Sequence, residues 1–358
     1  VIASACSGIY ESFNGGEKWA KINGIPSQSR RTRDILQHPT IPGTVYAATT
    51  EGFWMTTNGG KTWALTTQRN LEINSIAVHP DEPNRVFIGT NNYGVMVSND
   101  GGRNFQQTNT NFSSRFTYLV TPDVQKGNRL YAATHNTATG GGFFFVSDDS
   151  GATWKQSVGL DTGRVRTFTL RQDGTNPNTM FLGTNLGIFR SADRGNSWTQ
   201  LAAAKPAAKP PVKKPAAKPA AKPAVKSPAK ATVKKTAAVT ARNTAPAVTS
   251  SAPKLIPALT EKVTIIETIP GGGLYAGTDK GLYRSLDLSK GWEKLSFGAG
   301  LNENVFAVHV SAARPDTVWV GTATSGVLVS RDKGMTWNKA GGAADNVPIS
   351  SITSDPKR

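Results

Sequence analysis

A short motif that recurs seven times limits the possible folds of this chain more than any other feature. It has the form Ser/Thr-x-Asp/Asn-x-Gly-x-x-Trp/Phe, and its first copy comprises Ser12, Asn14, Gly16 and Trp19. Successive copies begin 44, 42, 49, 44, 94 and 45 residues apart. The long spacing falls into the range of the others when a Lys/Pro-rich segment is subtracted, so the motif marks a structural repeat. Its third positions are Asn14, Asn58, Asp100, Asp149, Asp193, Asp287 and Asp332.

Each copy lies in the same pattern of short strands, which the third repeat shows well. Residues 73–79 (INSIAVH) and 85–90 (RVFIGT) predict two strands, and residues 94–98 (GVMVS) and 104–108 predict two more. Pro, Asn and Gly break these β-branched runs, as is typical of antiparallel strands joined by hairpins. We name the four strands A to D in chain order. One four-stranded sheet per ~44 residues, repeated radially, predicts an all-β fold, a seven-bladed β-propeller.

The two ends of the chain together complete the ring. The first residues, VIASA, GIYES and EKWAKI, predict strands B, C and D without a strand A, whereas residues 349–355 (ISSITSD) predict a strand A alone. We therefore expect the N- and C-terminal strands to share blade 1. Residues 1–201 then contain blades 1–5, residues 254–358 contain blades 6 and 7 and the closing strand, and residues 202–253 form an insert.

The residue types of the motif suit a turn better than a catalytic site. Asp or Asn at the third position accepts backbone hydrogen bonds across its own turn, and Gly at the fifth adopts a positive φ without steric cost. The aromatic residue covers the apolar layer between blades. Seven equivalent positions around a ring cannot form one active site, so we interpret the motif as structural. His38 and His79 also recur at one repeat position, which favours a structural role.

On these residues the chain resembles the Asp-box (BNR) repeat propellers, and the resemblance covers everything except the insert. That superfamily includes sialidases, xyloglucanase-type glycoside hydrolases, the sortilin ectodomain and the photosystem II stability/assembly factors. Sialidases have six blades and a Phe-Arg-Ile-Pro signature that this chain lacks. Sortilin-type propellers have ten blades, and xyloglucanase-type enzymes use two propellers that face one cleft. A single seven-bladed propeller is most similar to the assembly-factor group, although the motif is specific for fold and not for activity.

Arginines gather in the connections from strand D of one blade to strand A of the next. Counted back from the end of each A strand, Arg31 and Arg33 match Arg164 and Arg166, so we expect the two pairs to converge near the channel mouth. Such a patch suits a carboxylate-bearing partner, and the assembly-factor resemblance implies protein binding of this kind. We therefore expect a non-enzymatic scaffold for a protein partner; solvated arginines on a loop rim are the alternative. The binding residues are predicted to be Arg30, Arg31, Arg33, Arg69, Arg115, Arg164 and Arg166.

A carbohydrate-active propeller, which binds or cleaves glycans, is the main alternative function. A glycosidase needs two carboxylates separated by ~5–9 Å. No Ser–His triad pattern is present. The single cysteine, Cys6, and four histidines without metal-ligand spacing predict neither a metal site nor a cofactor. The acids in suitable D–A connections are Glu72, Asp161, Glu303 and Asp345.

The insert accounts for most of the net charge of +17, because residues 202–253 contain ten Lys, one Arg and no acid. Such a segment is expected to be a disordered, solvated spacer that leaves the propeller beside the arginine patch. Non-specific contact with anionic polymers or lipid headgroups is the second interpretation. DNA binding is the third, but without interleaved aromatic residues we expect no specific nucleic-acid recognition.

The sequence also bears on location. No apolar run approaches the ~18 residues that span a bilayer, so no transmembrane segment is expected. The chain does not open with a signal segment. The propeller type favours an extracytoplasmic protein, periplasmic or secreted.

Overall fold

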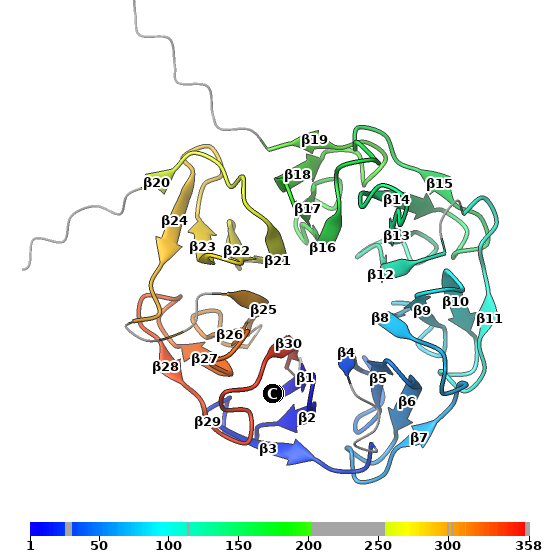
Figure 1. The fold of residues 1–358 in the computed structure, drawn as a ribbon, viewed down its shortest axis with the longest axis horizontal. Coiled ribbons are helices and arrows are strands. Elements are labelled where there is room, and N and C mark those ends of the chain that lie inside the picture. Colours follow the sequence, from blue (N-terminus) through cyan, green and yellow to red (C-terminus); the bar gives the residue numbers. More distant parts are fainter. Residues whose placement is uncertain are drawn as a thin grey trace, which may run out of the picture. The chain divides into compact units, whose positions relative to one another are not determined.

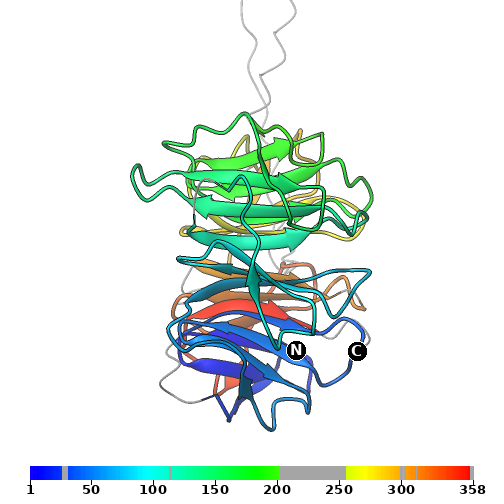
Figure 2. The same ribbon diagram turned by 90° about the vertical axis from the view of Figure 1, so that its right-hand side faces the viewer.

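The computed structural model describes residues 1–25, 31–112, 115–201, 255–298, 301, 304–311 and 313–354. These residues form seven β-sheets arranged radially around one axis (Figure 1). Seen edge-on, the strands run between the two faces of the ring (Figure 2). The described residues contain strands and no α-helix, and none of their elements is a helix that could cross a membrane. The fold is the predicted seven-bladed β-propeller.

Each blade has four strands, A to D, from the axis outward, and two blades carry one further outer strand. Blade 1 contains β30 (Ile349–Thr353), β1 (Ile2–Ala5), β2 (Gly8–Glu11), β3 (Lys18–Ile22) and the additional β29 (Gly341–Gly342). Blade 2 contains β4 (Thr32–Gln37), β5 (Val45–Thr49), β6 (Gly52–Thr56) and β7 (Ala64–Leu65). Blade 3 contains β8 (Ile73–Val78), β9 (Val86–Thr90), β10 (Val95–Ser98) and β11 (Gln106–Gln107).

The remaining four blades repeat this order. Blade 4 contains β12 (Thr117–Pro122), β13 (Leu130–His135), β14 (Gly142–Ser147) and β15 (Lys155–Gln156). Blade 5 contains β16 (Thr167–Gln172), β17 (Met180–Thr184), β18 (Gly187–Ser191) and β19 (Thr199–Gln200). Blade 6 contains β21 (Val263–Thr268), β22 (Leu274–Thr278), β23 (Gly281–Ser285), β24 (Trp292–Leu295) and the additional β20 (Leu255–Ile256). Blade 7 contains β25 (Val305–Val310), β26 (Val318–Thr322), β27 (Val327–Ser330) and β28 (Asn338–Lys339).

Strands from the two ends of the chain close the ring, as predicted. β30 pairs antiparallel with β1, and Ala3 lies opposite Ile352. The hydroxyl groups of Ser4 and Ser350 are 3.0 Å apart, which adds a side-chain hydrogen bond to this pairing. Blade 1 therefore obtains its inner strand from the far end of the sequence.

Seven hydrophobic layers, one at each boundary between neighbouring blades, stabilise the ring. The layer between blades 7 and 1 contains Trp19, Trp319, Ile349 and Ile352, all buried. Burial of apolar surface contributes about 25 cal/mol per Å². Each blade contributes to two layers, so damage to one blade weakens two boundaries.

The repeat motif forms the turn between strands C and D. In blade 5, the Ser191 hydroxyl donates to Asp193 Oδ1 (2.7 Å) and accepts the N–H of Gly195 (2.9 Å). Asp193 also accepts the N–H of Ser197 (2.9 Å), and Gly195 has a φ of 80°. The carboxylate is thus occupied by its own turn, which supports the structural interpretation of the motif.

Blade 6 contains the weakest copy of the motif, in which Ser289 replaces the glycine. Asp287 here accepts the N–H (3.0 Å) and the hydroxyl (2.6 Å) of Ser289. The Ser285 hydroxyl is buried and has no hydrogen-bond partner among the described residues. The loss of glycine therefore rearranges this turn without removing it.

The first residue after strand A caps the connection to strand B. His38 Nδ1 accepts the N–H of Ile41 (3.0 Å), and His79 Nδ1 accepts the N–H of Glu82 (3.0 Å). Burial lowers the pKa of His38, so its ring stays neutral and can accept. The structural role predicted for the two histidines is confirmed. The same cap is made in blades 4, 5 and 7 by Asp123, Asp173 and Ser311.

The insert lies outside the described residues, but the strands on either side of it are described. β19 precedes it as the outermost strand of blade 5, and β20 follows it and pairs antiparallel with β24 of blade 6. We expected the insert to leave the propeller beside the arginine patch. Its described neighbours are outermost strands of two blades, because a D–A connection starts from the outermost strand of a blade, and the exit point of the insert stays a prediction.

The side chain of Asp34 links blade 2 to blade 3. Its two oxygens accept the N–H groups of Ile35 and Ile76, each at 2.9 Å. Burial raises the pKa of this carboxyl to about 6, although both hydrogen bonds act in the opposite direction. In blade 3 the equivalent Ser75 makes the same kind of link, because its hydroxyl accepts the N–H of Val120 (2.9 Å).

Replacing Asp34 with serine is expected to remove part of the pH dependence of unfolding. Folded Asp34 keeps its proton up to about pH 6, whereas an unfolded aspartate releases it near pH 4, so the free energy of unfolding falls between these values as pH rises. Serine preserves the link and does not titrate, so Asp34→Ser should lack this fall, which is on the order of 2 kcal/mol. Urea titrations of both proteins at about pH 4 and about pH 7 measure the difference. Identical pH dependence in the two would contradict the role of Asp34.

Candidate functional site

One face of the ring contains the starts of the seven A strands and the B–C turns. We call this face the D–A face. Each A strand has a β-bulge at its second residue, which shifts the register against strand B. Bulges re-aim side chains and are common beside functional sites. All seven bulged residues are half-buried. They are Arg33, Asn74, Tyr118, Phe168, Thr264, Phe306 and Ser350.

Arg33 is the centre of a hydrogen-bonded cluster between blades 2 and 3. Its Nη2 donates to Glu72 Oε2 (2.8 Å), and its Nη1 donates to Asn74 Oδ1. Asn91 Nδ2 donates to the same oxygen of Glu72 (2.5 Å), and Asn74 Nδ2 donates to Asn91 Oδ1 (2.9 Å). The Glu72 side chain is nevertheless 43% exposed. A carboxylate is thus held in place and remains open to solvent; we call these four residues the Glu72 cluster.

Tyr93 is an exposed aromatic residue in the same B–C turn as Asn91 of the cluster. It lies two residues after Asn91, in the turn between β9 and β10, and is 42% exposed. Its N–H donates to the Thr90 hydroxyl (3.0 Å), and its carbonyl accepts from Asn109 Nδ2 (2.8 Å), so its backbone is fixed. An exposed ring beside fixed donors and acceptors can stack on a flat ligand while polar groups orient it.

A second cluster lies between blades 5 and 6. The Arg166 guanidinium and the Lys262 ammonium are 5.5 Å and 4.7 Å from the centroid of the Phe168 ring. The Arg166 N–H of the main chain donates to Asn185 Oδ1 (2.7 Å), which fixes the backbone here. The side-chain Nε of Arg166 is buried and has no hydrogen-bond partner among the described residues. We call Arg166, Phe168 and Lys262 the Phe168 cluster.

The other predicted arginines differ in their surroundings. Arg69 pairs with Glu51 (3.9 Å) and lies over the ring of Trp54, 5.9 Å from its centroid. Arg30 lies outside the described residues. Three further arginines are exposed and form no ion pair with any described residue; they are Arg31, Arg115 and Arg164.

The expected match of Arg31 and Arg33 with Arg164 and Arg166 is wrong by two positions. The strand registers make Arg31 equivalent to Arg166, and Arg33 equivalent to Phe168. The match was counted back from the end of each A strand, and in blade 2 a His-Pro pair marks that end. Blade 5 lacks this pair, so its count started from the wrong residue. The arginines therefore form two different clusters and not one repeated pair.

The predicted acids lie in different surroundings. Glu72 belongs to its cluster, Asp161 is exposed, and Asp345 pairs with Lys339 (2.7 Å). In the described part of the chain no group of His, Cys, Asp and Glu could hold a metal ion. Glu303 lies outside that part.

Inspection of the sequence missed the neutral and aromatic members of both clusters. Two of them, Asn74 and Phe168, share the second position of strand A, which becomes visible only when the A strands are aligned by their pairing with strand B. The longer B–C turn of blade 3 (NNYG) was a further signal. The missed residues are Asn74, Asn91, Tyr93, Phe168 and Lys262.

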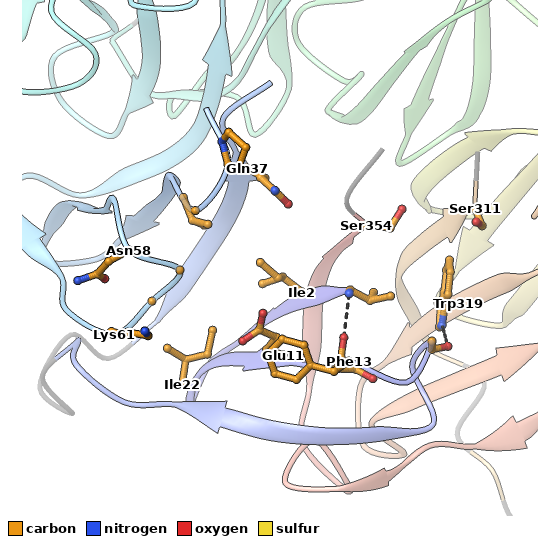
Figure 3. A pocket seen from close by; sticks show the side chains of 18 of the residues that line it. Ile2, Glu11, Phe13, Ile22, Gln37, Asn58, Lys61, Ser311, Trp319 and Ser354 are labelled. Carbon is orange, nitrogen blue, oxygen red and sulfur yellow. Dashed lines mark hydrogen bonds between the residues drawn. The ribbon is translucent and has the colours of Figure 1, made fainter. Parts of the chain in front are cut away.

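A cavity of about 460 Å³ lies on the opposite face (Figure 3). It is flanked by the A–B connections of blades 2 and 7, and it opens where blade 1 receives its A and B strands from different ends of the chain. Phe13, Trp63 and Trp319 line it, and Glu11 is its one acid among the described residues. The cavity therefore follows from the split of blade 1 and contains no pair of carboxylates.

Two curated relatives are similar to this chain, and both are xyloglucanases. The protein from Paenibacillus sp is 26% identical over 194 residues, which cover 52% of this chain and 18% of the relative. The protein from Hypocrea jecorina is 24% identical over 192 residues, covering 52% and 22%. The chain thus matches less than a quarter of the length of either relative. The family model "Sortilin, neurotensin receptor 3" matches residues 7–141.

Solved structures share the propeller fold. An ancestral GH74 enzyme has a TM-score of 0.60 and 19% identity, covering 89% of this chain and 37% of its own. YCF48 bound to D1 peptide has a TM-score of 0.50 and 15% identity, covering 86% and 84%. The extracellular domain of a putative hybrid two component system from B. thetaiotaomicron has a TM-score of 0.56 and 11% identity, covering 91% and 42%.

The expectation of a non-enzymatic protein-binding scaffold is contradicted. It depended on a resemblance of fold and on an arginine patch that the strand registers divide into two clusters. The curated relatives are glycan-degrading enzymes and support the alternative, a carbohydrate-active propeller. The family-model match and the solved structures agree with the β-propeller fold.

Proposed function

We propose that this chain is a carbohydrate-active propeller that binds a glycan on its D–A face, through the Glu72 cluster and Tyr93. The observation that carries the proposal is the exposed Glu72 carboxylate, which Arg33 and Asn91 hold in place, with the exposed Tyr93 in the same B–C turn as Asn91. If the chain has a catalytic activity, we infer that it is glycoside hydrolysis, in line with its xyloglucanase relatives.

The chemistry of the Glu72 cluster suits sugar hydroxyls. A carboxylate accepts hydrogen bonds, the Arg33 guanidinium donates them, and the amides of Asn74 and Asn91 do both. The internal hydrogen bonds hold these groups in fixed directions before a ligand arrives, so less conformational freedom is lost on binding. Tyr93 would supply the apolar surface against which a pyranose ring packs.

Hydrolysis would require a second carboxylate facing Glu72. No other described acid contacts the cluster. The resemblance to enzymes in which two propellers face one cleft implies that the opposing acid comes from a second propeller. We infer that this chain forms one wall of such a cleft. We also place it among the Asp-box repeat propellers and in an extracytoplasmic location, where polymeric glycans occur.

Replacing Tyr93 with alanine tests this site. Xyloglucan, a neutral β-1,4-glucan polymer, is the ligand, and retardation in native gels that contain it measures binding. Loss of the ring is expected to weaken binding about tenfold, because aromatic contacts are worth about 1 kcal/mol beyond their buried area. Glu72→Gln, which removes the charge but keeps the shape, should weaken it as well.

The matched control is Phe13→Ala. Phe13 is 81% exposed and lies on the opposite face, so its removal deletes an accessible ring away from the site and should leave retardation unchanged. Circular dichroism melting checks that each variant is folded. Wild-type protein that shows no retardation by xyloglucan or by other β-glucans would refute glycan binding, and equal losses in the two alanine variants would refute the site.

A further inference from the structure

The cations of the D–A face are unevenly neutralised. Arg33 pairs with Glu72 and Arg69 with Glu51, so these two charges are balanced inside the protein. Arg31 has no such partner among the described residues, and neither do the cations around blades 4 to 6. They are Arg115, Arg164, Arg166 and Lys262.

The Phe168 cluster holds two of these charges close together. Arg166 and Lys262 both lie over one ring, at 5.5 Å and 4.7 Å from its centroid. A ring face attracts a cation, but it does not replace the full solvation of two charges. The Arg166 Nε is already out of contact with solvent and has no partner among the described residues. The nearest acids in sequence, Asp161 and Glu261, form no ion pair with either cation.

The positive charge of Arg166 also acts on His135. Burial lowers the pKa of His135, and the charge of Arg166 lowers it further. The His135 imidazole therefore stays neutral and does not add a third cation. Two cations that share a ring and lack an anion are suited to receive one from a ligand, since charge-assisted hydrogen bonds to a carboxylate or sulfate are strong.

We propose that the Phe168 cluster is a subsite for the anionic group of an acidic glycan, a carboxylate or a sulfate on a sugar of the chain bound at the Glu72 cluster. This inference rests on the proposed function and adds to it a preference for glycans that carry negative charge. Phe168 packs against the sugar ring that bears the acid, and Arg166 and Lys262 bind the acid itself. Both clusters contain bulged residues at equivalent positions of their A strands, so they lie on the same face.

Two polymers with the same β-1,4-glucan backbone separate the effect of charge from that of the sugar. Hydroxyethyl cellulose is neutral, and carboxymethyl cellulose carries carboxylates. Native gels containing either polymer, run toward the cathode with the full chain, report both affinities. Arg166→Gln combined with Lys262→Gln is expected to weaken binding to carboxymethyl cellulose at least about tenfold and to leave hydroxyethyl cellulose unaffected.

The basic insert makes a charge-matched control essential, because it attracts any polyanion. Lys61→Gln combined with Lys126→Gln removes the same charge from two exposed lysines on the opposite face. This variant should keep its affinity for carboxymethyl cellulose. Equal losses in the two double variants would show that binding follows net charge alone and would overturn the subsite.

The outcomes also separate the subsite from the proposed function. Binding of hydroxyethyl cellulose without any preference for carboxymethyl cellulose would overturn the acidic subsite and leave glycan binding intact. Absence of binding to both polymers and to xyloglucan would overturn both. A preference for carboxymethyl cellulose that persists in Arg166→Gln/Lys262→Gln would assign the anion to another part of the chain and refute the Phe168 cluster.

Discussion

Replacing Ile349 with aspartate is expected to prevent stable closure of the ring. Ile349 is fully buried at the start of β30, in the layer between blades 7 and 1. An aspartate there would place a carboxylate among the apolar side chains of this layer. The free energy of unfolding should fall by about 4 kcal/mol or more, the range of the most damaging single substitutions.

Urea unfolding followed by tryptophan fluorescence measures this loss, since Trp19 and Trp319 belong to the same layer. Ile41→Asp is the matched control: it makes the same chemical change at a side chain that is 48% exposed, and it should alter stability by less than about 1 kcal/mol. An Ile349→Asp protein with the unfolding midpoint of the wild type would show that β30 does not close blade 1. Because β30 also contacts blade 2 through Ser350, the open form should lose xyloglucan binding as well.

The fold was predictable because its signals repeat. A single Ser-x-Asp-x-Gly turn is weak evidence, but seven turns at a common spacing define the blades, and the unpaired strands at the two ends define the closure. The physical reason is that each turn uses local contacts, such as Ser191 to Asp193, that any copy of the motif can form by itself. Local chemistry of this kind can be read directly from a sequence.

The candidate site was much less predictable because its contacts join different blades. Arg33 and Glu72 were each noted, but their 2.8 Å contact depends on a bulge in β4 and on packing of blade 2 against blade 3. The register error between blades 2 and 5 has the same origin. Only the pairing of strand A with strand B reveals that Arg33 and Phe168 are equivalent.

The erroneous scaffold function shows a related limit. The scaffold prediction used the number of blades and the excess of arginine on one face. Function depends instead on which of these cations already have acidic partners inside the protein. Arg33 and Arg69 have internal acidic partners, while Arg166 and Lys262 have none among the described residues. Sequence composition assigns all four the same charge, and the structure divides them into two groups.

Asp123 has two roles, a local cap within blade 4 and a contact with blade 5. Asp123 caps its own A–B connection through the N–H of Lys126 (2.9 Å). It also accepts the Tyr131 hydroxyl (2.7 Å) and the Gln172 amide (2.7 Å), and it pairs with Arg194 of blade 5 (2.8 Å). The carboxylate is completely buried, and the Arg194 side chain is 15% exposed. His38 and His79 cap the same position but form no such pair with a neighbouring blade.

Replacing Asp123 with alanine is expected to destabilise the propeller by about 3–5 kcal/mol, because it leaves a largely buried arginine and two further donors without their acceptor. Burial raises the pKa of Asp123, but the hydrogen bonds from Tyr131, Gln172 and the backbone lower it by more, so the net pKa is below the ordinary value. The stabilisation is therefore complete above about pH 4 and is lost as pH falls through the depressed pKa. Urea titrations at neutral pH and at about pH 3 should show a large difference between wild type and variant at the first and a smaller one at the second.

Asp316→Ala provides the control, because Asp316 also follows an A strand and pairs with a lysine of a repeat turn, Lys333, at 3.2 Å. Both side chains of that pair are more than half exposed, so its loss should cost less than about 1 kcal/mol. If the two variants lose equal stability, burial does not set the strength of these links. If Asp123→Ala loses much more, and Arg194→Ala recovers part of the loss in the double variant, the unpaired arginine is the cause, and the boundary between blades 4 and 5 is held by charge as well as by its apolar layer.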